Sequence, residues 1–433
     1  MTVQAWRWIG IGICLALLAA GCRGKKPQTE FERQIPWIGT GSWIKADLHV
    51  HSRFSDGIRT PREIADQAKI HACDAIALTE HTDSELKGAT DEYFAAIAEL
   101  RAEHPDLIIL DGIEWNVPPG AGDDHAGLLV PPGPEGVHVL KEFKARFDDW
   151  GRDSHDEALA LTALRWLSNE SADWDTPPVL IFNHPSRKLA HSLDPLAKLR
   201  RFRAESPILI AIEGAPGHQG RTSIGSYERT ETTIDRWDPA AARTGDLWDQ
   251  LLQGGEDWWG ALAFSDFHEE VADGLHDYWP GQFSETWLYV PERTAAGVLR
   301  ALRAGCFFAD HGAIVREVKL TVEAPGLERP AWAGESIRVP ESTPVVARVA
   351  MSVPERDWTG EPNRIDRIEL IAVDANGARV VAARAPEAQP IAFTESVPVS
   401  KGGVVLRARG TRLVPGGPSL CFYTNPVRVT AVR

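Results

Sequence analysis

KADLHVH, residues 45–51, predicts a β-strand over Lys45–Val50 that ends in two histidines. Because His49 and His51 are two residues apart, an extended backbone points both imidazoles to the same face. Two neutral imidazoles on one face can bind a single divalent cation. Asp56, in the predicted turn Ser55-Asp56-Gly57, adds a carboxylate shortly afterwards. This stretch therefore predicts a metal site at the C-terminal end of the strand.

Further side chains that bind metals follow along the chain, nearly all at or just beyond the ends of predicted strands. The strands are predicted at 45–50, 74–79, 107–113, 179–182, 208–213 and 260–264. The candidate ligands after the first strand are His81, Glu114, His125, His184, Asp266 and His268. His125 is expected in a loop. Side chains gathered at strand ends favour a (β/α) barrel, whose active site lies at the C-terminal ends of its strands.

Helical stretches alternate with these strands. One helix is predicted to start at Thr60, because Pro61 and Glu63 complete a capping pattern there, and another covers 93–102. The alternation favours a parallel α/β domain over residues 43–314. After about Val315, short alternating runs separated by turn residues predict a β-sandwich over 315–433. These runs are 317–323, 344–349, 367–373, 403–409 and 427–432.

The first residues suggest targeting rather than fold. The apolar run from Trp8 to Ala20 is shorter than the roughly 20 residues that span a bilayer and suits a signal-peptide core. It ends in small residues before Cys22, which resembles a bacterial lipobox. We expect a signal peptide over 1–21, a lipid anchor at Cys22 and a tether over 22–42. The protein would then lie in the cell envelope, as a periplasmic or outer-membrane lipoprotein. An ordinary secretory signal or a membrane-anchoring helix is the alternative.

Composition excludes several classes of function. A net charge of −15 over 433 residues argues against a surface that coats nucleic acid, which needs basic patches. No Ser has the surroundings of a nucleophile elbow, and no Walker loop or dinucleotide fingerprint follows a predicted strand. Cys73, Cys306 and Cys421 lack the spacing of a disulfide framework or a zinc finger and are expected to be buried.

The order of these motifs resembles the PHP (polymerase and histidinol phosphatase) superfamily, a set of metal-dependent phosphoesterases. The motifs lie between Lys45 and Gly312: H-x-H followed by S-D-G, T-x-H, a strand-end Glu, N-H-P and D-x-H. The resemblance implies a distorted (β/α)7 barrel that holds up to three metals at its top, here followed by the all-β sandwich. Segments 246–252, 286–290 and 301–305 are similar to the carbaryl-hydrolase-like branch, whose members are often secreted and fused to β domains.

The resemblance also implies three metal positions. The first would be bound by His49, His51, Glu114 and Asp266. Glu114 would bridge to the second, which His125 and His184 would hold. The third would be bound by Asp56, His81 and His268. Imidazole and carboxylate ligands admit zinc, manganese and iron alike.

Other polar side chains are candidates for roles beside the ligands. Arg187 could clamp a phosphate or carboxylate, or form a surface ion pair. Asp83 and His311 are candidates for the acid that protonates the leaving group. Asn183 and Glu80 are expected behind the ligands, although the family often has Asp in place of Glu80, and Glu213 could face the site or cap a helix. The remaining histidines of helices and loops are expected to be solvated: His71, His104, His138, His155, His191 and His218.

These observations predict a metal-dependent hydrolase. We expect it to cleave a small-molecule phosphoester with a hydroxide bridged between two of two or three divalent cations. Hydrolysis of a carboxylic or carbamic ester on the same centre is the alternative reaction. A non-catalytic metal-binding envelope protein is the alternative of another class.

Overall fold

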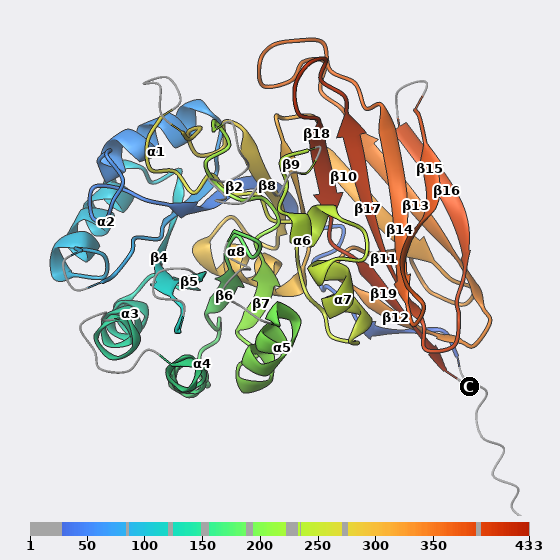
Figure 1. Cartoon of the computed structure of the whole chain (residues 1–433), viewed down its shortest axis with the longest axis horizontal. Helices are drawn as coiled ribbons and strands as arrows, with labels where there is room; N and C mark the ends of the chain where they lie inside the picture. Colours follow the sequence, from blue (N-terminus) through green and yellow to red (C-terminus); the bar gives the residue numbers. More distant parts are fainter. Residues whose placement is uncertain are drawn as a thin grey trace, which may run out of the picture.

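The computed structural model describes residues 28–432, except 84–85, 120–123, 149–155, 188–193, 222–232, 234, 271–275 and 387–390. An α/β barrel and a strand-rich domain lie side by side (Figure 1). The helices of the described part are α1 (Pro61–Ile70), α2 (Asp91–Glu103), α3 (Pro134–Phe147), α4 (Glu157–Glu170), α5 (Pro195–Glu205), α6 (Pro239–Ala242), α7 (Leu247–Gln253) and α8 (Ala295–Ala304).

The barrel sheet follows the chain in the order β2-β3-β4-β5-β6-β7. Its strands are β2 (Ser42–Val50), β3 (Ala75–Leu78), β4 (Ile108–Asn116), β5 (His125–Val130), β6 (Val179–Phe182) and β7 (Leu209–Ile212). Neighbouring strands run parallel except β5, which is antiparallel to both β4 and β6. Every residue of β3, β6 and β7 is buried, because helices cover one face and the barrel interior covers the other.

Residues 259–267 close the barrel between β7 and β2. Isolated parallel bridges join Ala211 to Trp259, Ala215 to Ala263 and Val50 to Phe267. The regular strand predicted over 260–264 is absent from this described segment, because the N–H groups of Gly214 and Ala215 converge on one carbonyl, that of Leu262. With this segment the barrel has seven staves, which confirms the predicted distorted (β/α)7 architecture.

Helices surround the barrel wall (Figure 1). The first of them, α1, shows the predicted capping box: Thr60 accepts the N–H of Glu63, and the Glu63 side chain accepts the N–H of Thr60. The buried residues of α1 are Pro61, Ile64, Ala65 and Ala68. Ile64, Ala65 and Ala68 pack on β3 with residues from α2 such as Tyr93 and Ile97. Helix α1 is thus stabilised both by its N-terminal capping box and by burial of its apolar face.

The C-terminal domain is a β-sandwich, as predicted. One sheet has the order β11-β10-β13-β16, and the facing sheet contains β1, β12, β19, β17 and β18, with β14 and β15 beside β17. The bounds are β1 (Glu30–Arg33), β10 (Glu317–Glu323), β11 (Ala331–Trp332), β12 (Ser336–Pro340), β13 (Pro344–Ser352), β14 (Arg367–Asp374), β15 (Gly377–Arg384), β16 (Ile391–Pro398), β17 (Val404–Arg412), β18 (Leu420–Thr424) and β19 (Val427–Val432). Buried and outward-facing residues alternate along β10 and β13, as in a sheet with one covered face.

The two domains share one continuous sheet. β8 (Ser284–Val290) pairs with β2 of the barrel, and β9 (Phe307–His311) pairs with β8 and with β18 of the sandwich. Helices α6 and α7 lie between the barrel wall and the sandwich (Figure 1). Backbone hydrogen bonding between strands therefore continues from one domain into the other.

The segment before β2 differs from the predicted tether over 22–42. Residues 30–33 form β1, which pairs with β12, and the Trp37 indole donates to the Tyr289 carbonyl at 2.9 Å. Ile35 is buried beside Cys306 and Tyr289. From Glu30 onward the chain is therefore part of the fold, and the tether prediction is wrong for 30–42. The predicted signal peptide over 1–21 and Cys22 lie outside the described residues. Within the described residues, no helix combines the length and the hydropathy needed to cross a membrane.

Candidate metal centre

The candidate ligands meet at one end of the barrel, because each follows from a strand that ends there. His49 and His51 come from the end of β2, and His81 follows β3. Glu114 lies near the end of β4, and His184 follows β6. His125 reaches the same end from the opposite direction, because β5 is antiparallel and its first residue pairs with Asn116 of β4. His125 is thus a strand residue and not the predicted loop residue.

Glu114 lies at the middle of the group. One of its oxygens, Oε1, is 3.0 Å from Nε2 of His49, 3.3 Å from Nδ1 of His125 and 3.4 Å from Nε2 of His184. The other oxygen, Oε2, is 3.3 Å from Nε2 of His51 and 3.4 Å from Nε2 of His81. The two oxygens of one buried carboxylate therefore face two different sets of imidazoles, as a carboxylate that bridges two cations would.

Asp266 faces the same two imidazole nitrogens as Glu114. Its Oδ1 is 3.1 Å from Nε2 of His49 and 3.3 Å from Nε2 of His51. Asp266 has φ +46°, a left-handed conformation that is rare for a residue other than glycine. A Cβ on the neighbouring Gly217 would lie 2.0 Å from the Asp266 Cβ, so only glycine fits there. Strain of this kind collects at functional sites.

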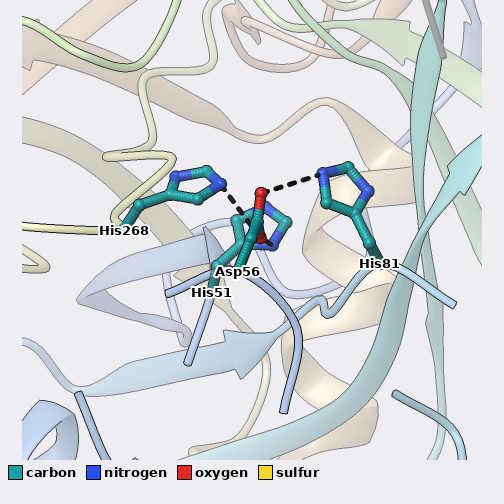
Figure 2. Close-up of side chains that lie close together, drawn as sticks. All are labelled: His51, Asp56, His81 and His268. Carbon is teal, nitrogen blue, oxygen red and sulfur yellow. Dashed lines mark ion pairs between the residues drawn. The ribbon is translucent and has the colours of Figure 1, made fainter. Parts of the chain in front are cut away.

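Asp56 gathers a third set of imidazoles (Figure 2). Its carboxylate lies 3.6 Å from Nδ1 of His51, 3.9 Å from Nε2 of His81 and 3.4 Å from Nε2 of His268. The rings of His51 and His268 stack at 4.1 Å. This set matches the predicted third position, with His51 added to it.

Donor atoms of these residues lie close enough for several cations. Within each of three groups the ligand atoms are no more than 4.8 Å apart. The groups are His49, His51, Glu114 and Asp266; His81, Glu114 and His125; and His51, Asp56, His81 and His268. The first group is the predicted one. In the second, His81 takes the place predicted for His184, although His184 faces the same Glu114 oxygen as His125.

The electrostatics of the centre fit divalent cations. Burial alone lowers the pKa of His51, but the carboxylates of Asp266 and Glu114 outweigh it and raise that pKa to about 10. Burial raises the pKa of Glu114, but the surrounding imidazoles outweigh it and hold that pKa well below its ordinary value. Nε2 of His51 and Nε2 of His184 are buried and make no hydrogen bond, although each is within 3.4 Å of a Glu114 oxygen. Cations between these atoms would satisfy both partners, since imidazole and carboxylate are their common ligands.

Buried polar groups orient the ligands from behind. Glu213 accepts from the backbone N–H of His184 at 3.0 Å and lies 3.1 Å from Nδ1 of His49, so it faces the site and is not a helix cap. The Asn183 amide donates to Glu114 at 2.8 Å. Glu80 accepts the backbone N–H of Ser52, just after His51, at 3.0 Å. Asn183 and Glu80 therefore act as predicted, behind the ligands.

Two residues at the centre were missed in the sequence. His218, predicted to be solvated, has its Nδ1 2.7 Å from Asp277 and its Nε2 3.6 Å from Asp266. Asp277 is buried and also accepts the backbone N–H groups of His268 and Glu269, at 2.6 and 3.1 Å. The available signal was position: His218 follows the end of β7, as the ligands follow the ends of other strands.

The three predicted substrate-contact residues have different outcomes. Arg187 lies at the centre, where its guanidinium donates to Asp266 at 2.9 Å. Asp83 follows His81 and Thr82, and its backbone carbonyl accepts the N–H of Leu86 at 3.0 Å. Its role as leaving-group acid stays a prediction. His311 is fully buried between Trp237 and Phe283, with ring centroids at 5.1 and 4.8 Å. Its described ring contacts are with these aromatic side chains and not with the metal ligands, and its role as leaving-group acid stays a prediction.

The remaining histidines and cysteines differ in their exposure. His138 is exposed, as predicted, whereas His104 is buried near Asp66. His155 and His191 lie outside the described residues. Cys73, Cys306 and Cys421 are buried and free, as expected.

A family model matches part of the barrel. Residues 47–169 match the family model of the PHP domain. The chain is 32% identical over 155 residues to a 3',5'-nucleoside bisphosphate phosphatase of Chromobacterium violaceum. The aligned region covers 34% of this chain and 49% of that protein. It is 35% identical over 78 residues to an uncharacterised protein of Methanocaldococcus jannaschii, covering 18% of this chain and 36% of that one. The chain thus spans about a third to a half of the length of these relatives.

Two solved structures are similar at low identity. One is a two-domain protein of Bacteroides vulgatus that contains a predicted PHP-like metal-dependent phosphoesterase. It shares 15% identity with this chain, and the match covers 94% of this chain and 100% of that one, with a TM-score of 0.43. Histidinol phosphate phosphatase of Lactococcus lactis, complexed with zinc, L-histidinol and phosphate, shares 18% identity, covers 39% of this chain and 84% of its own, and has a TM-score of 0.21. The predicted resemblance to the PHP superfamily is confirmed over residues 47–169. The narrower likeness to the carbaryl-hydrolase-like branch stays a prediction.

Proposed function

We propose that this PHP-domain protein is a metal-dependent phosphoesterase that works with two or three divalent cations. The observation that carries the proposal is the arrangement around Glu114, whose two oxygens face two sets of imidazoles. The nine predicted ligands would hold the cations: His49, His51, Asp56, His81, Glu114, His125, His184, Asp266 and His268. When bound, such cations supply an acidic water and positive charge for the substrate oxygens.

Side chains beside the ligands would bind and orient the phosphoryl group. Arg187 has a guanidinium within 2.9 Å of Asp266, so it can reach a phosphoryl oxygen held next to that carboxylate. His218 is held by Asp277 through Nδ1 and directs Nε2 toward the same carboxylate. It is therefore better placed than Asp83 or His311 to hydrogen-bond an oxygen of the substrate.

The substrate class that we propose is a small phosphomonoester. The name of the Chromobacterium violaceum relative, a 3',5'-nucleoside bisphosphate phosphatase, supports this class. The cation-rich centre also suits it, because a phosphomonoester brings the negative charge that the cations and Arg187 would bind.

The test is a panel of 4-nitrophenyl phosphate and 4-nitrophenyl acetate, each with manganese or zinc. We expect turnover of the phosphate, and we expect the double substitution His49→Ala, His51→Ala to abolish it and to lower the metal content. His138→Ala, an exposed position on α3, serves as the control. Wild-type turnover by the double variant would refute the proposal.

A second candidate is hydrolysis of a carboxylic or carbamic ester on the same centre. Segments 246–252, 286–290 and 301–305, which are similar to the carbaryl-hydrolase-like branch, favour it. Turnover of the acetate without the phosphate would support this candidate. Bound metal without turnover of either substrate would support a non-catalytic metal-binding protein.

We also propose that the protein lies in the bacterial cell envelope, anchored by a lipid at Cys22. The apolar run from Trp8 to Ala20 and the small residues before Cys22 support this location. Labelling of cells with a fatty-acid probe tests it: the wild-type protein should become labelled, and Cys22→Ser should not.

A further inference from the structure

The sandwich domain touches the segment that carries Asp277. Asp277 binds His218 through one oxygen and the backbone N–H groups of His268 and Glu269 through the other. The next residue, Tyr278, packs edge-on against Trp358, with ring centroids 4.9 Å apart. Trp358 lies between β13 and β14 of the sandwich. One aromatic contact thus connects the C-terminal domain to the residue next to Asp277.

The loop that carries Trp358 is firmly held. The Asp357 carboxylate accepts the backbone N–H of Thr359 at 2.8 Å and of Glu361 at 3.1 Å. Asp357 also pairs with Arg412 of β17. Side-chain bonds to nearby N–H groups fix the course of a turn, and the arginine fastens this turn to the sheet.

The barrel side of this contact is equally specific. The backbone N–H of Trp358 donates to the Gly312 carbonyl at 3.1 Å. A Cβ on Gly312, which has φ +77°, would lie 2.7 Å from Cδ1 of Trp358, so the indole needs glycine there. Phe283 packs on both rings, 4.9 Å from Tyr278 and 5.1 Å from Trp358. The indole therefore has one defined place against the barrel.

The loop with His218 is bound to the same segment. The Gly220 N–H donates to the His276 carbonyl at 2.8 Å, next to the His218–Asp277 contact. His218 has φ +56°, so its backbone is held in a conformation that surrounding contacts must maintain. A shift of residues 276–278 would therefore move His218 and loosen the N–H bonds of His268 and Glu269.

We propose that Trp358 and Tyr278 are positioning residues, through which the sandwich domain sets the place of the His218–Asp277 pair at the metal centre. The inference rests on the proposed function and deepens it, because it gives the C-terminal domain a part in the reaction. It predicts that loss of the indole lowers kcat while leaving KM and metal content largely unchanged.

The chain offers a matched control. Trp332 of β11 also belongs to the sandwich and also packs on a barrel tyrosine, Tyr289, at a ring distance of 5.5 Å. Tyr289 pairs with Trp43 at the beginning of β2, whereas the ligands lie at the end of that strand. Trp332→Ala thus removes a similar contact at the end of the barrel remote from the metal centre.

The experiment compares Trp358→Ala, Trp358→Phe and Trp332→Ala with manganese and 4-nitrophenyl phosphate. We expect Trp358→Ala to lower kcat about 10- to 100-fold, since small misplacements near reacting groups have effects of this size. Trp358→Phe should retain most activity, because its ring can still pack on Tyr278. Trp332→Ala should lower the melting temperature but not kcat. An equal loss of kcat in Trp358→Ala and Trp332→Ala would overturn the proposal.

A double-mutant cycle tests whether Trp358 acts through His218. If it does, Trp358→Ala should lower kcat by a much smaller factor in a His218→Asn background than in the wild type, because the effects of coupled residues are not additive. Fully additive losses would contradict the proposal.

Hydrogen exchange keeps the test independent of activity, should the proposed function fail. The backbone amides of His268 and Glu269 donate hydrogen bonds to Asp277. Trp358→Ala should speed hydrogen exchange at these two amides, and Trp332→Ala should not. Unchanged exchange in Trp358→Ala would refute the coupling even in a protein without phosphoesterase activity.

Discussion

The carboxylate of Glu213 lies 3.1 Å from Nδ1 of His49, and both side chains are buried. A metal-binding histidine commonly donates its second ring N–H to such a carboxylate, which fixes its tautomer and its orientation. Glu213 also accepts the backbone N–H of His184. One carboxylate at the end of β7 therefore aligns ligands from β2 and from the residues after β6.

Glu213→Gln should weaken this alignment. An amide is a poorer acceptor than a carboxylate, so we expect a loss of about 10- to 100-fold in metal affinity or kcat. Calorimetric titration with manganese or zinc, together with steady-state kinetics, measures both quantities. Glu285→Gln is the control, because Glu285 is also buried but pairs with Lys45. Equal losses in the two variants would show that the effect is not specific to the centre.

Arg187→Gln should distinguish the two candidate reactions. If Arg187 clamps a phosphoryl group, the loss of a charge-assisted hydrogen bond should raise KM for 4-nitrophenyl phosphate about 10- to 100-fold. Turnover of 4-nitrophenyl acetate, which is neutral, should change little. Arg101→Gln, which removes an arginine paired with Asp111, controls for the loss of a charge. An unchanged KM for the phosphate would exclude the clamp.

The ligands that were predicted correctly depend on local geometry. In H-x-H the two-residue period of a strand places His49 and His51 on one face whatever the rest of the chain does. His81 and Glu114 follow apolar runs that are evident in the sequence. The shared end of parallel strands then brings these residues together.

The features that the sequence did not predict depend on tertiary contacts. His125 was predicted as a ligand but was expected in a loop, because no short motif encodes the antiparallel register that pairs it with Asn116 in β5 and β4. His218 and Asp277 lie in loops, and only the folded chain shows their 2.7 Å contact. Likewise, residues 30–33 lacked a strand prediction because they form β1 only by pairing with β12, about 300 residues later.

The junction between the domains contains a buried two-point ion pair. Nε of Arg407 is 2.7 Å from one oxygen of Asp249, and Nη2 is 2.9 Å from the other. Both side chains are buried, and the guanidinium lies 4.6 Å from the Trp248 ring. Removal of one partner leaves the other charge buried, which typically costs about 3–5 kcal/mol.

Arg407→Met and Asp249→Leu should therefore each lower the urea midpoint strongly. The double variant should recover much of the loss, because it leaves no unpaired charge in the junction. As a control, Arg338→Met removes exposed pairs with Glu30 and Glu32 and should cost less than about 1 kcal/mol. Additive losses in the Arg407 and Asp249 double variant would show that the charges are not coupled.

Asp148 supports the residues next to two ligands. One of its oxygens accepts the backbone N–H of Asn116 at 3.2 Å and the Asn116 amide at 3.1 Å, and the other accepts the Thr82 hydroxyl. Thr82 follows His81, and Asn116 is two residues beyond Glu114. Burial raises the pKa of the Asp148 carboxyl to about 7, although these hydrogen bonds oppose the shift.

Asp148→Asn should change how stability depends on pH. An unfolded aspartate has a pKa of about 3.9. Between about pH 4 and pH 7 this aspartate is ionised in the unfolded chain, whereas folded Asp148 keeps its proton. The stability that protonated Asp148 contributes is therefore fully present below about pH 4 and is lost as the pH rises through about 7. Asparagine does not titrate, so wild-type stability relative to Asp148→Asn should fall from pH 5 to pH 7 by about 1.4 kcal/mol per pH unit and then level off. Urea unfolding at pH 5, 6, 7 and 8 measures this, with the exposed Asp173→Asn as a control for the substitution. Parallel curves for wild type and Asp148→Asn would mean that Asp148 is already ionised in the fold at pH 5.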